Sequence, residues 1–374
     1  MNNERLLSLF CELVQIESPS RDEAAMAKRC ARELSEMGFS VEFDNSVQAT
    51  GSTTGNLVAH LPGTCPGHIV LSAHMDTVQP CTNIVPIVEE GIVRSSGQTI
   101  LSADDKAGIA AIFEAVRTTL EQSVPRPDIT VVLTTCEELS LLGAGALDIN
   151  LLPEGAPCFI FDADGAPGTV IMGAPCHRSF EAHFLGRAAH AGVEPEAGIS
   201  AIQMAASAIA NMSLGRLDDI TTANVGVIEG GSETNVVADS CMIKGECRSL
   251  DIKRADACVS AINDALDAAA DRFGGTVEYT WREDYGAVNY GESHELVCQI
   301  KRACKRAGVE FRPHISGGGA DANILCTRGV KAITLGIGMT NFHSVDEFIS
   351  VSDLQACARL AFALIAEAAD PIRS

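Results

Sequence analysis

Short apolar runs typical of strands alternate with amphipathic stretches typical of helices along the first half of this 374-residue chain. The strand-type runs are 41–43, 57–59, 68–73, 128–134 and 158–161. The helical stretches, with apolar residues three or four positions apart, are 6–14, 24–37 and 106–120. Because alternating strands and helices usually build a parallel sheet with helices on both faces, this order predicts an α/β fold with a mostly parallel sheet.

The pattern changes near His177. The expected elements then run strand, helix, strand, strand, helix, strand, at 177–185, 199–212, 221–228, 236–249, 252–273 and 277–281. This β-α-β-β-α-β order is a self-contained unit. We therefore expect one domain made of residues 1–176 and 286–374, with residues 177–285 inserted into it as a second domain.

Composition argues against several classes of partner. The formal net charge of −22 disfavours nucleic acid, whose phosphates need Lys and Arg contacts, and anionic membrane surfaces. No apolar run approaches bilayer length, and the N-terminus lacks the basic segment and apolar core of a signal peptide. The fourteen cysteines form no C-x-x-C pair. We therefore expect buried free thiols in a cytoplasmic protein, and no cysteine-ligated zinc.

Five strings of acidic residues and histidine follow apolar runs or turns. They are residues 72–76 (SAHMD), 103–106 (ADDK), 136–138 (CEE), 161–162 (FD) and 341–344 (NFHS). The carboxyl ends of parallel strands are where such sheets bind ligands. Together, and in this order, the strings predict the ligands of two divalent metal ions about 3.5 Å apart, which hold one water for hydrolytic chemistry.

The first two strings can supply a histidine and a bridging carboxylate. His74 and Asp76 are two residues apart at a strand end, so their side chains point to the same side. A metal-bound histidine usually has a carboxylate on its other ring nitrogen, and Asp76 is the candidate for that role. Asp104 alone would be read as ordinary helix capping. Beside His74, however, its two oxygens can bridge two cations.

The third string predicts both a ligand and a base. Glu137 and Glu138 follow an apolar strand, where two carboxylates are costly unless positive charge lies nearby. Because neighbouring side chains alternate, we expect one to bind metal and the other to act as general base. Two divalent cations carry about four positive charges. Asp104, Glu138 and Asp162 offset three of them, and a bridging hydroxide offsets the fourth.

Two neutral histidines, His74 and His343, complete the predicted ligand set. A further carboxylate, from Asp164, would raise the negative charge above the positive charge of the two cations. We therefore expect Asp164 to lie outside the ligand set, next to it or in a structural role. It stays open as an alternative to Asp162.

Two further features suggest contacts with a substrate. Arg248 suits bidentate capture of a substrate carboxylate, but a salt bridge would explain it equally well. The stretch 316–323 (SGGGADAN) contains a glycine triplet, including Gly317 and Gly318, which lets the backbone approach a ligand closely. No Lys-Ser/Thr follows, so the stretch is not a phosphate loop, and we expect a substrate-binding loop.

Five longer strings carry a resemblance to a known family: SAHMDTV, ADDKAGIAAI, GRAAHAG, ETNVVAD and FHSVDEFI. They resemble the di-zinc metallopeptidase family of peptidase T, carboxypeptidase G, aminoacylase and succinyl-diaminopimelate desuccinylase, most of all its peptidase T-like branch. The resemblance covers essentially the whole chain. It implies that His74, Asp104 and Asp162 hold one metal, and that Glu138, His343 and the shared Asp104 hold the other.

The resemblance implies further roles as well. Asp76 would orient His74, and Glu137 would be the general base. A cis peptide would follow the bridging aspartate, at Asp104–Asp105. His190, in GRAAHAGVEP, would donate to the developing oxyanion. Among residues of the inserted domain, Asn235 is a candidate for substrate contact.

We accordingly expect a hydrolase of amide bonds that uses a metal-bridging hydroxide and Glu137. The resemblance implies an aminopeptidase acting on short peptides, similar to tripeptidases. N-acyl amino acid deacylase, dipeptidase and carboxypeptidase activities on the same centre stay open, as does a non-catalytic metal-dependent binding protein. Zinc is the expected metal, with cobalt or manganese as alternatives. The inserted domain is expected to act as a lid or to form a homodimer.

Overall fold

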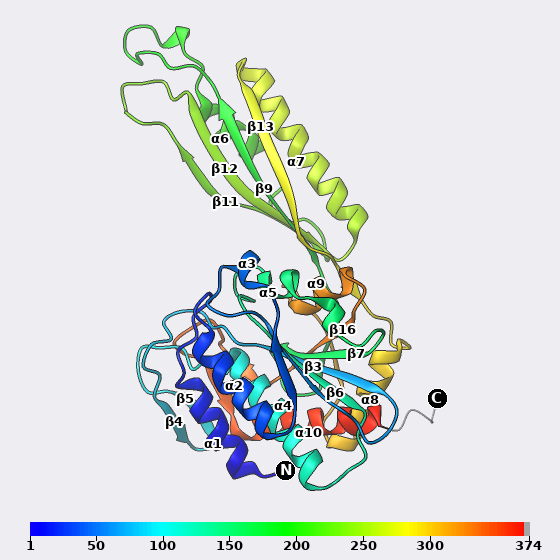
Figure 1. The fold of residues 1–374 in the computed structure, drawn as a ribbon. Coiled ribbons are helices and arrows are strands. Elements are labelled where there is room, and N and C mark those ends of the chain that lie inside the picture. Colours follow the sequence, from blue (N-terminus) through cyan, green and yellow to red (C-terminus); the bar gives the residue numbers. More distant parts are fainter. Residues whose placement is uncertain (370–374) are drawn as a thin grey trace. The chain divides into compact units, whose positions relative to one another are not determined.

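The computed structural model describes residues 1–369, and the chain divides into two compact units (Figure 1). Unit 1 contains Met1–Met172, Tyr290–Ser316 and the chain from Ala320 onward. Unit 2 contains Gly173–Asn289 together with Gly317–Gly319. The expected insertion, 177–285, thus lies inside unit 2, which is longer by four residues at each end (177 against 173 and 285 against 289).

Unit 1 is built on a nine-stranded sheet with the order β1-β2-β6-β3-β7-β16-β8-β14, in which β15 pairs with β8 and the last strand, β14, is assigned to unit 2. The four central strands run parallel, and they are β6 (Asp128–Thr134), β3 (His68–His74), β7 (Pro157–Ala163) and β16 (Lys331–Gly336). The strands beside them pair antiparallel with their neighbours. These are β1 (Ser40–Phe43), β2 (Leu57–Leu61), β8 (Thr169–Ala174) and the short β14 (Val288–Asn289), while β15 (Arg312–Ile315) pairs with β8. The prediction of a mostly parallel α/β sheet is therefore confirmed.

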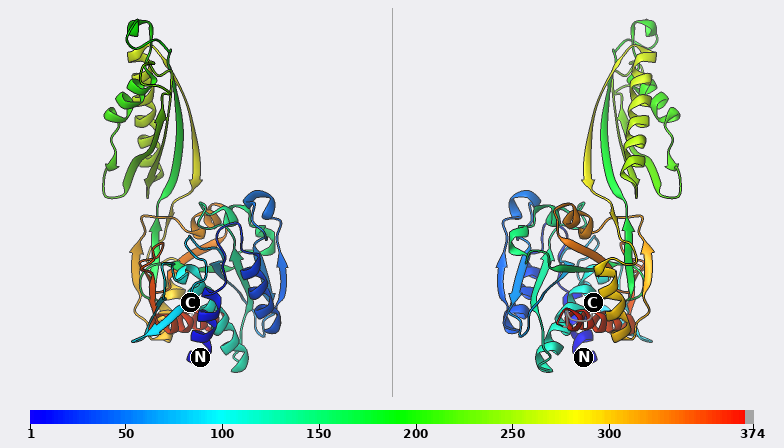
Figure 2. Two further views of the ribbon diagram at one scale, coloured as in Figure 1. Left: turned by 90° about the vertical axis from the view of Figure 1, so that its left-hand side faces the viewer. Right: turned by 90° about the vertical axis from the view of Figure 1, so that its right-hand side faces the viewer.

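Helices cover both faces of this sheet (Figures 1 and 2). The larger core includes residues of α1 (Asn3–Val14), α2 (Ala24–Glu36), α4 (Ala103–Glu121), α8 (Glu295–Ala307) and α10 (Val351–Ala368). The smaller core includes residues of α5 (Leu142–Ala146) and α9 (Asp321–Thr327). In β3, Ile69 and Leu71 face the larger core and Val70 faces the smaller one. This alternation explains why the strand is apolar throughout.

A second sheet in unit 1 was not expected from the sequence. Its order is β17-β18-β5-β4, and its strands are β4 (Pro86–Glu89), β5 (Ile92–Ser95), β17 (Met339–Thr340) and β18 (Phe348–Ser350). These strands have only two to four residues each, too few for a recognisable alternation. The sheet holds both ends of the segment 341–347, which contains His343. Two short helical segments complete the unit, α3 (Val47–Thr50) and the 3-10 turn η1 (Ile149–Leu151).

Unit 2 is an antiparallel sheet with the order β10-β11-β12-β9-β13, and its two long helices lie on one face (Figure 2). The strands are β9 (Cys176–Leu185), β10 (Gly215–Arg216), β11 (Thr221–Gly230), β12 (Ser240–Ser249) and β13 (Thr276–Tyr285). The helices are α6 (Ala201–Asn211) and α7 (Ile252–Phe273), with a 3-10 turn, η2 (Pro195–Ala197). The β-α-β-β-α-β order is confirmed, with the two-residue β10 added.

The predicted start of one strand of unit 2 is wrong. The strand expected at 236–249 begins only at Ser240. Val236 and Val237 instead pair with the loop that contains His190, through a bridge between His190 and Val236 and a 2.9 Å hydrogen bond from the Val237 N–H to the Ala189 carbonyl. The apolar valines therefore continue the pattern of the strand without joining its sheet.

Two expectations drawn from composition can be compared with the structure of residues 1–369. No helix in this part of the chain combines the length and apolarity that a bilayer crossing requires. The cysteines are free thiols, and those within apolar stretches, such as Cys30, Cys158 and Cys241, are buried. The prediction of buried free thiols is confirmed.

Candidate metal centre

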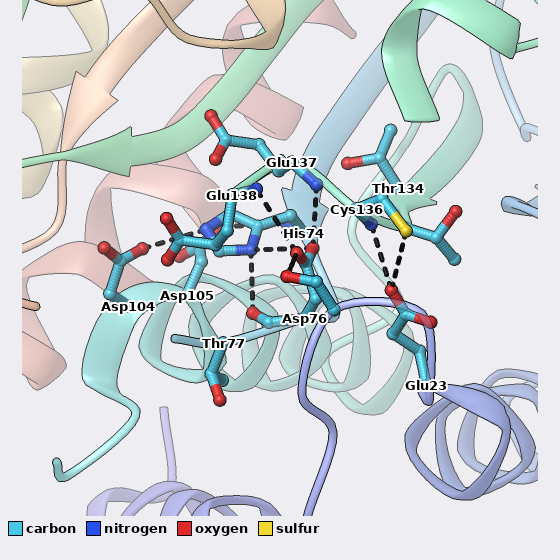
Figure 3. A network of polar contacts seen from close by, with 12 residues as sticks. Glu23, His74, Asp76, Thr77, Asp104, Asp105, Thr134, Cys136, Glu137 and Glu138 are labelled. Atoms are coloured by element: carbon cyan, nitrogen blue, oxygen red, sulfur yellow. Dashed lines mark hydrogen bonds and ion pairs between the residues drawn. The ribbon is translucent and has the colours of Figure 1, made fainter. Parts of the chain in front are cut away.

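The site forms where neighbouring parallel strands end. His74 is the last residue of β3, Asp162 lies near the end of β7, and Glu137 and Glu138 follow β6. Since β6, β3 and β7 are adjacent and parallel, their carboxyl ends meet at one edge of the sheet. Figure 3 shows the side chains of His74, Asp104 and Glu138 gathered at this edge.

Asp104 lies between two histidines. Its Oδ1 is 2.8 Å from Nε2 of His74, and its Oδ2 is 3.2 Å from Nε2 of His343. The side chain is almost fully buried, so both oxygens are held in place. A carboxylate that presents one oxygen to each of two histidines has the geometry needed to bridge two cations.

One further carboxylate accompanies each histidine. Oδ1 of Asp162 is 3.3 Å from Nε2 of His74, and Oε2 of Glu138 is 2.9 Å from Nε2 of His343. Ligand atoms around tetrahedral zinc, at bond lengths of about 2.0–2.1 Å, lie roughly 3.3 Å apart. The two sets of donor atoms, which share Asp104, therefore fit divalent cations in spacing and in chemistry.

The sequence left open whether Asp162 or Asp164 is the fifth metal ligand, and the structure places the two residues differently. One ligand atom each of His74, Asp105 and Asp162 lie within 4.8 Å of one another, as do ligand atoms of His74, Asp104 and Glu138. Asp164 is exposed and belongs to neither group. Asp162, near the end of β7, lies 3.3 Å from Nε2 of His74, whereas Asp164 follows the strand and is exposed.

Asp76 contacts the site differently from what we expected. Nδ1 of His74 lies 2.9 Å from the backbone carbonyl oxygen of Asp76, whereas the nearest carboxylate oxygen is 3.5 Å away. Because a carbonyl only accepts, Nδ1 must carry the proton, which leaves Nε2 for a metal. The Asp76 carboxylate instead accepts the N–H groups of Glu137 at 2.9 Å and Glu138 at 3.2 Å, and the hydroxyl of Ser20 at 2.7 Å.

The turn that carries the two glutamates is held at four successive backbone N–H groups. Oδ1 of Asn56 accepts from Thr135 and Oε1 of Glu23 accepts from Cys136, both at 3.0 Å. Asp76 accepts from the next two residues. Asn56 and Glu23 are fully buried, and Figure 3 shows Glu23 beside Cys136. Neither was identified from the sequence, because nothing near them in the chain suggests this contact.

Asp105 is a further residue of the site that the sequence analysis did not assign. It is fully buried; its Oδ2 accepts the N–H of His74 at 3.1 Å, and its Oδ1 accepts the N–H of Gly108 at 3.2 Å. A Cβ at Gly108 would lie 2.3 Å from that same oxygen and 2.4 Å from the Phe161 carbonyl oxygen. Because Gly108 has no Cβ, α4 can lie this close to the Asp105 carboxylate and the Phe161 carbonyl. The Asp104–Asp105 peptide is cis, as the resemblance implied.

The pKa values of the two histidines reflect the negative charge around them. Hydrogen bonds to Asp104 and then Glu138 raise the pKa of His343 to about 10. Burial by itself lowers the pKa of His74, but the carboxylates around it, led by Asp162, raise it well above its usual value. Both sites thus favour positive charge, which two cations would supply.

For two of the carboxylates, burial decides the direction of the pKa shift, and it disfavours their negative charge. Burial, followed by repulsion from Asp162, raises the pKa of Glu137 well above its usual range. Burial raises the pKa of Asp162 to about 7. Asp104 is the exception: burial opposes its ionisation, but hydrogen bonds from His343 and His74 outweigh burial and hold its pKa below the usual value.

In unit 2, the structure brings together two pairs of predicted residues. His190 and Asn235 are exposed, and the Ala191 N–H bonds to the Asn235 carbonyl oxygen at 2.9 Å, so their segments are adjacent. The Arg248 guanidinium contacts the carbonyl oxygen of Gly317 at 3.4 Å.

Arg248 was expected either to bind a substrate carboxylate or to form a salt bridge. Its guanidinium forms two hydrogen bonds with the carboxylate of Glu246, at 3.0 and 3.1 Å. It also lies 3.4 Å from the Tyr285 hydroxyl. The salt bridge is therefore present. Gly318, the next residue after Gly317, is half-buried.

A mixed α/β domain with two histidine–carboxylate groups beside the carboxyl ends of its parallel strands has the donor set of a metal-dependent hydrolase. The model of peptidase family M20/M25/M40 matches residues 70–367, so the chain belongs to this family and is a metallopeptidase. A curated relative in Bacillus subtilis (strain 168), uncharacterized protein YqjE, is 39% identical over 370 residues, which cover 99% of this chain and 100% of the relative.

Two solved structures are similar over nearly their whole length. Aminopeptidase PepT from Bacillus cereus ATCC 10987 has a TM-score of 0.93 and 38% identity, with 99% of each chain covered. A tripeptidase from Staphylococcus aureus subsp. aureus Mu50 has a TM-score of 0.94 and 35% identity, again with 99% of each chain covered. The resemblance to a di-metal peptidase family, drawn from the sequence, is thereby confirmed at the level of the family.

Proposed function

We propose that the protein is a two-metal aminopeptidase that removes the N-terminal residue from short peptides, tripeptides in particular. The arrangement that supports this most directly is Asp104, with one oxygen toward each of two histidines and the Glu137–Glu138 pair beside it. The names of the two similar solved structures, an aminopeptidase and a tripeptidase, favour this substrate class among those open to the family.

His74, Asp104 and Asp162 would hold one cation, and Asp104, Glu138 and His343 the other. When bound, such a pair of cations lowers the pKa of a water and polarises the scissile carbonyl. Zinc suits these nitrogen and oxygen donors, and cobalt or manganese are alternatives.

Glu137 is the proposed proton carrier. Its backbone is fixed by Asp76, so its carboxylate leaves the turn in a defined direction. It would accept the proton of the attacking water and return it to the leaving amine, a role that a pKa near the working pH favours. Burial raises the pKa of Glu137 in that direction, whereas nearby cations lower it.

Unit 2 would contribute the groups that meet the substrate. We propose that His190 donates to the developing oxyanion, and that Asn235, Arg248, Gly317 and Gly318 contact the peptide. The exposure of His190 and Asn235 is compatible with such contacts. A homodimer through unit 2 and a cytoplasmic location remain part of the proposal.

A matched substrate panel tests the proposal. Zinc-loaded protein is assayed on a free tripeptide, the same tripeptide with a blocked N-terminus, a dipeptide and an N-acyl amino acid, each with and without chelator. Chelator-sensitive cleavage of the free tripeptide, with the blocked peptide resistant, is the expected result. Preferential cleavage of the N-acyl amino acid would identify a deacylase instead. Binding of two cations without any turnover would favour a binding protein.

A further inference from the structure

A buried glutamate far from Asp104 in sequence holds the loop that leads into Asp104. Glu347 is 1% exposed. Its Oε2 accepts the backbone N–H groups of Leu101 at 2.7 Å and Ser102 at 2.8 Å, and its Oε1 accepts the N–H of Asp104 at 3.0 Å. A buried carboxylate is costly unless its oxygens are hydrogen-bonded, and both oxygens are used here for one short loop.

The loop needs this support. Ser102 has φ 64° and ψ 31°, a left-handed conformation that a non-glycine residue adopts only when its surroundings hold it. Asp104 and Asp105, although at the start of α4, also depart from helical φ and ψ. The helix therefore cannot fix the direction of the Asp104 side chain by its own backbone hydrogen bonds. Three backbone N–H groups that donate to one carboxylate can fix it.

Glu347 also links the two sides of the site. It lies four residues after His343, in the segment that β17 and β18 hold at both ends. The same segment thus supplies His343 and the carboxylate that holds Asp104, whose Oδ2 is 3.2 Å from the His343 ring. A shift of Glu347 would change the separation of these two groups while leaving His74, which β3 holds, in place.

We propose that Glu347 is a positioning residue for the cation held by Asp104, Glu138 and His343. It touches neither substrate nor cation and acts by holding the backbone of Asp104. The inference rests on the proposed two-metal centre, but its test measures cation binding and not turnover. A failure of the proposed substrate class therefore leaves the test of Glu347 intact.

The test compares Glu347→Gln with Asp346→Asn. The amide of the first variant keeps one acceptor and turns a donor toward backbone N–H groups, whereas the second makes the same charge change at the exposed neighbouring residue. Zinc binding to the metal-free proteins is measured by competition with a chromophoric chelator, together with zinc stoichiometry and thermal unfolding of the metal-free proteins. For Glu347→Gln we expect the zinc ion held by Asp104, Glu138 and His343 to bind about 10- to 100-fold more weakly. The other zinc ion shares Asp104 but keeps His74 and Asp162, so it should lose less affinity, and both should stay within about twofold of wild type in Asp346→Asn.

Each outcome decides the matter. Wild-type affinity at both sites in Glu347→Gln, or an equal loss at both, would overturn the positioning role. If Glu347→Gln does not fold, Glu347→Asp keeps the charge but withdraws the carboxylate by one methylene, and the same selective loss is expected from it. A wild-type protein that binds fewer than two zinc ions would overturn the two-metal centre itself, and the role of Glu347 with it.

Discussion

The carboxylate of Asp76 accepts the backbone N–H of Glu137 at 2.9 Å, while the backbone carbonyl of Asp76, and not its carboxylate, faces Nδ1 of His74 at 2.9 Å. One residue thus orients a ligand through its main chain and the proposed base through its side chain. A substitution of the Asp76 side chain therefore leaves the contact with His74 in place and disturbs the turn that carries Glu137 and Glu138.

Asp76→Asn should therefore lower kcat more than cation affinity. The amide keeps one acceptor oxygen but presents a donor to the second N–H of the glutamate turn, and a buried unsatisfied donor costs about 1–3 kcal/mol. We expect kcat to fall by about 10- to 100-fold with two cations still bound, since the carbonyl that orients His74 is unchanged. Steady-state kinetics and metal analysis check this. Ser20→Ala, which removes only the hydroxyl bonded to Asp76, is the milder control.

Glu137→Gln should abolish most of the turnover without loss of metal. Removal of a general base typically costs about 10²–10⁴-fold. The control is Glu138→Gln, which should lower the cation content because Glu138 lies 2.9 Å from His343 at the second set of donors. Near-wild-type turnover by Glu137→Gln would contradict the assignment of the base.

His190→Ala should lower kcat while changing neither KM strongly nor stability. Loss of one oxyanion donor costs about 10²–10³-fold in kcat, and the side chain is exposed, so its removal leaves no cavity. His183→Ala is the matched control, because His183 is an exposed histidine of the same unit, paired with Glu181 at 2.6 Å. Equal losses in both variants would show that the effect is not specific to an oxyanion contact.

Cation binding should release protons and strengthen as the pH rises. In the metal-free protein the pKa of His343 is raised to about 10, so the ring is charged at pH 7 and must lose its proton to bind a metal. The apparent affinity should therefore rise between pH 6 and 9, approximately tenfold per pH unit for each proton displaced. The stabilisation that this charged ring gives the metal-free protein is complete below its usual pKa of 6.5 and is lost as the pH rises through about 10. Calorimetry in two buffers of different ionisation enthalpy counts the released protons, and a pH-independent affinity would contradict the assignment.

Gly108→Ala should destabilise the protein by about 1–3 kcal/mol, because the new Cβ would lie 2.3 Å from the Asp105 carboxylate and 2.4 Å from the Phe161 carbonyl oxygen. A backbone oxygen cannot move aside as a flexible side chain would. Gly145→Ala in α5 is the control, since no atom lies within 4 Å of its added Cβ. That change should be neutral or slightly stabilising. Urea unfolding of the two variants makes the comparison, and equal stabilities would contradict the close approach of α4 to β7.

Much of the architecture follows from local pattern. The helix expected at 252–273 is α7, with the same ends, and the strand expected at 128–134 is β6. The helix has a clear helical periodicity, with Asp251 and Gly274 at its two ends, and the strand is a continuous apolar run. The ligand strings could be recognised for a related reason. Three of the five stand at the ends of apolar runs that form the adjacent parallel strands β3, β6 and β7, and such strands bring their carboxyl ends to one edge.

What the sequence by itself determined was therefore the fold class, the order of the elements and the residue types at the candidate metal centre. Only the tertiary structure decided how those residues are held. Glu23, Asn56 and Glu347 act through hydrogen bonds to backbone groups between 79 and 246 residues away. Such contacts have no local periodicity, because they depend on which chain segments meet after folding and not on which residues adjoin in the sequence. The same physical reason explains why the Asp76 carboxylate accepts the N–H groups of the glutamate turn, while the ring of His74 meets the Asp76 backbone carbonyl.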